Sequence, residues 1–211
     1  MKSPSALLST FSSLVTQTTP RLALYNPESF DWANFDAQQV VSANVDSTCT
    51  VWDVERQAVD TQLVVHDKEA SDISWGGFNV FASVSGDGSI RVFDLSDKER
   101  SIIFFENPIQ KYPLLRLEWN TVGPRAVRMD SNKVVIVDIQ FPTTPLMELC
   151  RHKGSVNATS WTPYNGRLLC SVGDDSWALI WEVVAAGDRS KNGDNLESDM
   201  WYGSSAEINN V

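Results

Sequence analysis

The sequence predicts an all-β fold, a β-propeller with about four blades of the seven that would form a ring. The first observation is a tryptophan ladder with spacings of 43, 44 and 42 residues: Trp32, Trp75, Trp119 and Trp161. The second is a similar series with spacings of 41, 44 and 44: Trp52, Phe93, Val137 and Trp181. A period of about 40 to 45 residues is typical of four-stranded propeller blades.

The third observation is that strand signals recur and helical ones do not. Segments 51–53, 90–93, 134–137 and 178–181 are rich in β-branched and aromatic residues. Turn residues precede two of them, at 85–88 and 173–175. No window of about eleven residues has a helical hydrophobic period, so we expect a repeat protein made of strands.

Four blades of this length predict an incomplete, open arc. A seven-bladed ring needs about 300 residues at this period, and the chain has 211. We therefore expect a fragment, an alternative product or a truncated copy of a longer protein. Unpaired strand edges and apolar flanks at both ends of the arc would favour self-association.

The chain divides into five kinds of segment. Residues 1–28 are a Ser/Thr-rich leader, expected to be disordered, with an organelle-targeting peptide as the alternative. Residues 29–184 hold four repeats, approximately 29–60, 61–104, 105–147 and 148–184. A polar linker follows at 185–198. Residues 199–211 are interpreted as the start of a further, truncated blade, within which 200–202 has the pattern of an outer strand.

Composition excludes several classes of function. Seventeen Lys and Arg against 27 Asp and Glu give a net charge of −10, which argues against direct binding of nucleic acid or an anionic membrane. No apolar run is long enough for a membrane-spanning helix. Three cysteines without a C-x-x-C pair indicate free thiols, and Cys150 with His152 is too small a set for a metal. We expect no cofactor and no metal.

One polar set recurs at fixed spacing. Aligned on a turn aspartate, a serine lies four residues before it and an aromatic residue six after it in three of the repeats. The second repeat has His66, Ser83 and Asp87; the fourth has His152, Ser171, Asp175 and Trp181; the first has Ser42, Asp46 and Trp52. The third repeat has Val127 and Val137 at the aligned positions and no histidine.

Two interpretations of this set compete. Serine, histidine and aspartate together suggest a hydrolase built on Ser83, His66 and Asp87. An active site is normally built once, however, whereas this set recurs with an aromatic residue in the fourth place. An imidazole that bridges a carboxylate and a hydroxyl, with an indole N–H as a further donor, satisfies every buried polar group. The pattern therefore favours a structural hydrogen-bond network and no enzymatic activity.

The same residues carry a family resemblance. The pairs that close each repeat resemble those of WD repeats: Trp52-Asp53, Phe93-Asp94, Val137-Asp138 and Trp181-Glu182. Segments 48–53, 66–69, 81–85, 113–117, 129–135, 178–181 and 207–209 are similar to the Transparent Testa Glabra group of WD-repeat regulators. The resemblance implies a nuclear and cytoplasmic scaffold that assembles MYB and basic helix-loop-helix transcription factors, in control of flavonoid pigmentation or epidermal cell fate.

The sequence departs from this group at four positions. Members carry arginine two residues after several blade-closing acids, a feature associated with the adaptor of a cullin ubiquitin ligase. The corresponding residues here are Glu55, Ser96, Gln140 and Val184. A substrate-recognition subunit of such a ligase is therefore the alternative to the transcription-factor scaffold, and a non-functional truncated copy is another. The stretch 119–130 is short for the group, which predicts an irregular second strand in the third repeat.

Overall fold

The computed structural model describes residues 27–33, 35–36, 38–96, 101–106, 113–120, 122, 125–130, 132–138, 145–163, 166–183 and 200–203. Every element in these ranges is a strand, which confirms the all-β prediction. No helix within them is long and apolar enough to cross a membrane. The predicted linker, 185–198, lies outside the described residues, as does the predicted leader, 1–28, except for residues 27–28, which begin the first strand.

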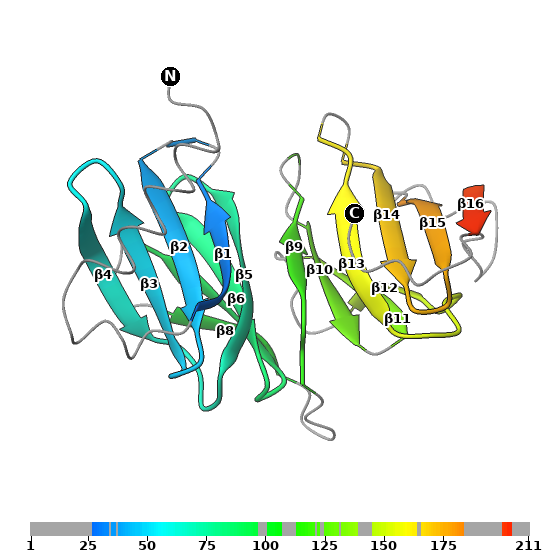
Figure 1. The fold of residues 1–211 in the computed structure, drawn as a ribbon, viewed down its shortest axis with the longest axis horizontal. Coiled ribbons are helices and arrows are strands. Elements are labelled where there is room, and N and C mark those ends of the chain that lie inside the picture. The colour runs from blue at the N-terminus through cyan, green and yellow to red at the C-terminus, as the bar shows by residue number, and fades with distance from the viewer. Residues whose placement is uncertain are drawn as a thin grey trace.

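The strands form four antiparallel sheets, each of four consecutive strands (Figure 1). The first sheet holds β1 (Pro27–Trp32), β2 (Gln39–Asn44), β3 (Thr48–Asp53) and β4 (Ala58–Val64), and the second holds β5 (Ala70–Gly77), β6 (Val80–Ser85), β7 (Ser89–Asp94) and β8 (Ser101–Glu106). The third holds β9 (Leu117–Trp119), β10 (Arg125–Asp130), β11 (Lys133–Asp138) and β12 (Pro145–Leu149), and the fourth holds β13 (Val156–Trp161), β14 (Leu168–Gly173), β15 (Trp177–Glu182) and β16 (Met200–Gly203). We call these sheets the first to fourth blades.

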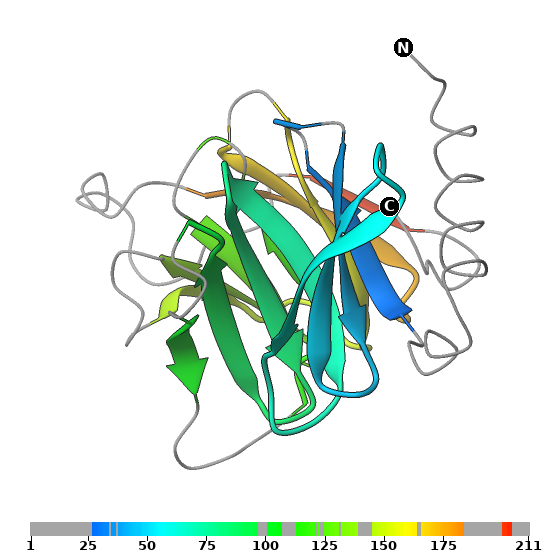
Figure 2. The ribbon, with the colours of Figure 1, turned by 90° about the vertical axis from the view of Figure 1, so that its left-hand side faces the viewer.

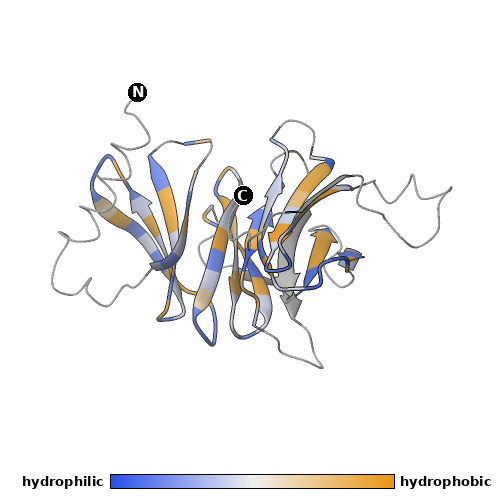
Figure 3. Ribbon diagram, turned by 45° about the vertical axis from the view of Figure 1, so that its right-hand side comes forward, coloured by the Kyte–Doolittle hydropathy of each residue, from blue (hydrophilic) through white to orange (hydrophobic). Residues whose placement is uncertain are grey.

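The blades stand side by side in chain order, as an open arc (Figures 1 and 2). The first strand of each blade is the inner one: β1 contacts β5, β5 contacts β9 and β9 contacts β13. Three apolar clusters fill the spaces between neighbouring blades. Figure 3 shows hydrophobic residues along the strands of the blades. Because β11 packs between two of these clusters, its four residues 134–137 are all buried.

A glycine lets the second and third blades come close together. A Cβ placed on Gly76 would lie 2.2 Å from the indole of Trp119, far inside van der Waals contact. The indole therefore packs directly over the backbone at the end of β5. Any side chain at this position would require the indole to move.

Two details of the predicted organisation need correction. Strand β16 pairs with β15 at the edge of the fourth sheet, which confirms the outer strand predicted at 200–202 but assigns it to the fourth blade and not to the further blade expected from residue 199. In the third blade β10 pairs with β11 over six consecutive residues with no shift in register. The short element is the inner strand β9, which has only three residues.

Candidate protein-interaction surface

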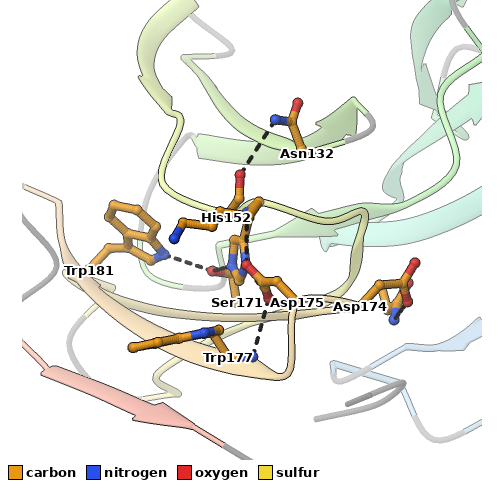
Figure 4. A network of polar contacts seen from close by, with 9 residues as sticks. Asn132, His152, Ser171, Asp174, Asp175, Trp177 and Trp181 are labelled. Atoms are coloured by element: carbon orange, nitrogen blue, oxygen red, sulfur yellow. Dashed lines mark hydrogen bonds and ion pairs between the residues drawn. The ribbon is translucent and has the colours of Figure 1, made fainter. Parts of the chain in front are cut away.

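The fourth blade contains a complete four-residue network (Figure 4). Trp181 donates its indole N–H to Ser171 Oγ over 2.8 Å, and Ser171 Oγ lies 2.7 Å from His152 Nε2. His152 Nδ1 lies 3.0 Å from Asp175 Oδ2. Because the indole can only donate, the consistent direction runs from Trp181 through the hydroxyl and the imidazole to the carboxylate. The network joins the loop before β13 to the turn between β14 and β15.

The second blade repeats the arrangement without the indole. His66 Nε2 lies 2.8 Å from Ser83 Oγ, and its Nδ1 lies 3.2 Å from Asp87 Oδ2 and 3.0 Å from Ser89 Oγ. The Asp67 and Ser89 amides donate to the same carboxylate over 3.1 and 2.8 Å. Phe93 stands in the place of the tryptophan and stacks on Phe81 in the core, with ring centroids 5.0 Å apart.

In the first blade, a chain of hydrogen bonds also connects the indole to the turn aspartate, but it contains no histidine. Trp52 donates to Ser42 Oγ over 3.0 Å, and Ser42 Oγ lies 3.3 Å from Asn44 Oδ1. Asn44 Nδ2 donates to Thr48 Oγ1 over 3.0 Å, and Thr48 Oγ1 donates to Asp46 over 2.6 Å. Ser42 and Asp46 belong to one chain of bonds, but Asn44 and Thr48, which the repeat spacing does not single out, connect them.

These geometries resemble a catalytic triad, but the hydroxyls are enclosed. Ser83 and Ser171 are both 0% exposed, and the His66 and His152 side chains are also buried. Burial lowers the pKa of His66, which keeps the imidazole neutral. Burial alone would raise the pKa of Asp87, but hydrogen bonds from Ser89 and the Asp67 amide lower it to about 2. The arrangement holds two loops together and gives no substrate a path to the oxygen.

A second set of polar residues joins the blades, and the repeat analysis missed it. The residue directly before each ladder tryptophan accepts the backbone N–H of the next blade's tryptophan. Trp75 N donates to Asp31 Oδ2 (2.8 Å), Trp119 N to Ser74 Oγ (3.2 Å) and Trp161 N to Glu118 Oε1 (2.9 Å). Asp72 adds a further link, since it accepts from Ser29 Oγ and from Leu117 N. A polar acceptor before every ladder tryptophan is the signal that would have revealed these bonds.

The acids of this second set hold their protons more strongly than usual. Burial raises the pKa values of Asp31 and Asp72, against the opposing effect of their hydrogen bonds. Burial likewise raises the pKa of Glu118 to about 7. Within the described residues, no group of three or more His, Cys, Asp and Glu is arranged to hold a metal ion. The three cysteines are free thiols, and burial raises the pKa of Cys49 to about 12.

Two exposed phenylalanines, Phe35 and Phe78, lie at the opposite ends of the strands from the histidine networks, whereas the exposed Trp177 lies beside Asp175 of the fourth-blade network. Phe35, in the β1–β2 loop, is 37% exposed, and Phe78, in the β5–β6 turn, is 74% exposed. Their ring centroids are 5.4 Å apart although they belong to different blades. Exposed aromatic side chains that touch each other are typical of protein-binding surfaces. This end of the first two blades is therefore the candidate interaction surface.

Comparisons with known proteins agree with the repeat architecture. No family model matches the chain. It is 45% identical, over 159 residues, to the DDB1- and CUL4-associated factor 7 homolog of Dictyostelium discoideum, covering 74% of this chain and 49% of that protein. It is 36% identical over 200 residues to a WD repeat-containing protein of Saccharomyces cerevisiae, covering 80% of this chain and 38% of that one.

A solved structure gives the fold independently. A chain in the crystal structure of the mitotic checkpoint complex matches with a TM-score of 0.71 at 20% identity, covering 86% of this chain and 52% of that one. The propeller-type architecture predicted from the aromatic ladders is thereby confirmed. The chain spans less than half the length of the two relatives named above.

Proposed function

This chain is a WD-repeat protein, and we propose that it acts as a non-enzymatic scaffold that holds partner proteins on its exposed loops. The observation that carries the proposal is the burial of every Ser–His–Asp set described above. Ser83 and Ser171 have no exposed surface, and each set ties one loop to one turn within its own blade. The polar chemistry of the chain is thus used to hold loops in place.

The finer proposal concerns the partners. The resemblance to the Transparent Testa Glabra group supports MYB and basic helix-loop-helix transcription factors as partners, with pigmentation or epidermal fate as the controlled process. The chain would then act in the nucleus and cytoplasm. Its net charge of −10 supports contact with the transcription factors themselves and not with their DNA.

A second candidate function is substrate recognition for a cullin ubiquitin ligase. It is favoured by the relative whose name associates it with DDB1 and CUL4. The residue Glu55, which stands where the resemblance expects an arginine for the ligase adaptor, disfavours it. The two candidates differ in which protein must bind.

A pull-down with the purified full chain separates them. MYB proteins, basic helix-loop-helix proteins and the DDB1 adaptor are offered in parallel, with a full-length relative as the positive control. Capture of a transcription factor supports the scaffold, and capture of DDB1 alone supports the ligase role. If the full-length relative captures a partner and this chain captures none of the proteins offered, both candidate functions would be contradicted.

Two further measurements test the remaining parts of the proposal. A serine-directed activity-based probe should leave Ser83 unlabelled, and labelling would contradict the non-enzymatic role. Self-association through blade edges stays a prediction of the sequence. Sedimentation at micromolar concentration should show oligomers, and a single compact monomer would contradict that prediction.

A further inference from the structure

The exposed aromatic pair is the outer end of a continuous aromatic column. Phe35 meets Trp75 edge to face with centroids 5.3 Å apart, and Trp75 meets Phe81 at 5.7 Å. Phe81 stacks on Phe93 at 5.0 Å in the core between the first two blades. Trp75 is only 3% exposed, whereas Phe78 at the outer end is 74% exposed. The column therefore holds two surface rings against a rigid base.

Hydrogen bonds hold the described residues next to both rings of the pair. In the β5–β6 turn Asn79 adopts a left-handed φ of 59°, and its carbonyl accepts the Leu95 N–H over 2.8 Å. In the β1–β2 loop the Asp36 carboxylate accepts the Gln38 N–H over 2.9 Å. Since both rings are held before any partner arrives, little conformational entropy is lost when one binds.

The surroundings of the pair are acidic. The Val54 N–H bonds the Gln38 carbonyl over 2.8 Å, which brings the end of β3 beside the Phe35 loop, and the Leu95 bond brings the end of β7 beside the Phe78 turn. Among the residues that the structure describes on these segments, we call the charged ones the rim: Asp36, Asp53, Glu55, Arg56 and Asp94. Four acids and one base give the rim a net charge of −3, and the base, Arg56, already pairs with Asp53 at 3.4 Å.

We propose that Phe35 and Phe78 form a docking site for a segment of a partner protein in which an apolar anchor residue is flanked by Lys or Arg. The inference rests on the proposed scaffold function and gives it a surface. The anchor covers the exposed phenyl rings, which supply the buried contact area. The flanking cations meet the rim carboxylates, which increases the rate of association and excludes acidic segments.

The test begins with a library of short random peptides displayed on phage and selected on the purified full chain. Peptides that are enriched are synthesised, and their affinities are measured by fluorescence anisotropy. We expect enriched peptides to combine an aromatic residue or leucine with Lys or Arg, and to bind more weakly as salt increases. Enrichment of acidic peptides would overturn the proposal.

Variants then locate the binding surface. Phe78→Ser should weaken the selected peptides about tenfold or more. The matched control is Val122→Ser, because Val122 is 56% exposed on the β9–β10 loop of the third blade and should leave binding unchanged. If Phe78→Ser fails to fold, the double variant Glu55→Lys/Asp94→Lys, which reverses charges on exposed side chains, should give a similar loss. Equal binding by wild type and by both variants would overturn the proposal.

Two comparisons keep the outcomes distinct. If sedimentation shows a Phe78-dependent oligomer and no peptide depends on Phe78, a second copy of the chain covers the pair and the proposal is wrong. If Phe78→Ser still captures the full-length partner in the pull-down, the scaffold function is supported and the proposed docking site is wrong. Loss of both peptide and partner by Phe78→Ser, with Val122→Ser unaffected, supports both.

Discussion

The first and fourth blades bury the same indole-to-hydroxyl bond but complete it differently. Trp52 bonds Ser42 at 3.0 Å and Trp181 bonds Ser171 at 2.8 Å. In the fourth blade an imidazole from the preceding loop carries the chain of bonds to the turn aspartate. In the first blade Asn44, from the end of β2 itself, does so through a threonine.

The comparison shows which part of the set is needed and which part can vary. Each chain of bonds begins at an N–H that can only donate and ends at a carboxylate that can only accept, so no buried polar atom along it lacks a partner. Any residue that can both accept and donate can fill the middle. Only the histidine reaches beyond the β-hairpin, so the fourth-blade network fixes the preceding loop as well. The second blade follows the fourth in this respect, through His66.

The largest expected difference lies at the turn aspartates. Asp87→Ala should lower the free energy of unfolding by about 2–4 kcal/mol, because His66, Ser89 and the Asp67 amide all lose their acceptor. Asp46→Ala should cost less than about 1 kcal/mol, since Asp46 is exposed and water replaces it. Denaturant unfolding measures both. Equal losses of unfolding free energy in the two variants would contradict the idea that the bond to His66 makes Asp87 more important for stability than Asp46.

The next effect concerns the residue that replaces histidine. Asn44→Ala should cost about 1–3 kcal/mol, because Thr50 Oγ1 and Thr48 Oγ1 lose a donor and Ser42 loses an acceptor inside the first blade. Gln38→Ala, at an exposed loop position, is the control and should change stability little. Unfolding curves that coincide for Asn44→Ala and the control would mean that the first-blade network contributes nothing.

A smaller and matched effect is expected for the two indoles. Trp52→Phe and Trp181→Phe each remove one N–H donor while keeping most of the ring, so each should cost about 1 kcal/mol through the lost bond. The second blade already has Phe93 at this position, which indicates that the phenyl ring fits. Thermal unfolding of the two variants should give similar shifts. A large loss of thermal stability in only one variant would show that the indole bond does not contribute equally in the first and fourth blades.

The smallest effect is a dependence on pH in the second blade. Because burial lowers the pKa of His66 below its usual 6.5, the folded chain binds fewer protons than the unfolded one, and stability falls as pH falls below 6.5. The contribution is at most about 1 kcal/mol between pH 6.5 and about 5.5. Glu118 acts in the opposite direction, since its pKa is raised to about 7 and its stabilising effect is lost as pH rises from 4.5 through 7.

The difference between wild type and His66→Gln isolates the histidine. Both proteins keep Glu118, so its contribution cancels when their unfolding free energies are subtracted at each pH. The difference should shrink as pH falls from 6.5, because only the wild type must then bury an imidazole that the unfolded chain protonates. A difference that is independent of pH would contradict a neutral, buried His66.

The sequence predicted the fold class and the blade number because aromatic residues at a fixed period occupy equivalent buried positions. Asn44 escaped prediction because the second and fourth blades have Ser85 and Gly173 at the same place. The blade-joining acceptors escaped because Asp31, Ser74 and Glu118 share only an ability to accept a hydrogen bond. Where several side chains satisfy the same requirement, the repeat pattern in residue types disappears although the geometry persists.

The blade-joining bonds also bear on the order of folding. The hydrogen bonds that Asp31, Asp72, Ser74, Glu118 and Asn120 make to the neighbouring blade join residues 43 to 46 positions apart, about one repeat. Closing a loop of this size has a modest entropic cost that does not grow with the number of blades. Any blade can therefore form first, and each neighbour docks onto it by a step of the same kind. We therefore expect folding along this chain to proceed by successive additions of one blade to the next.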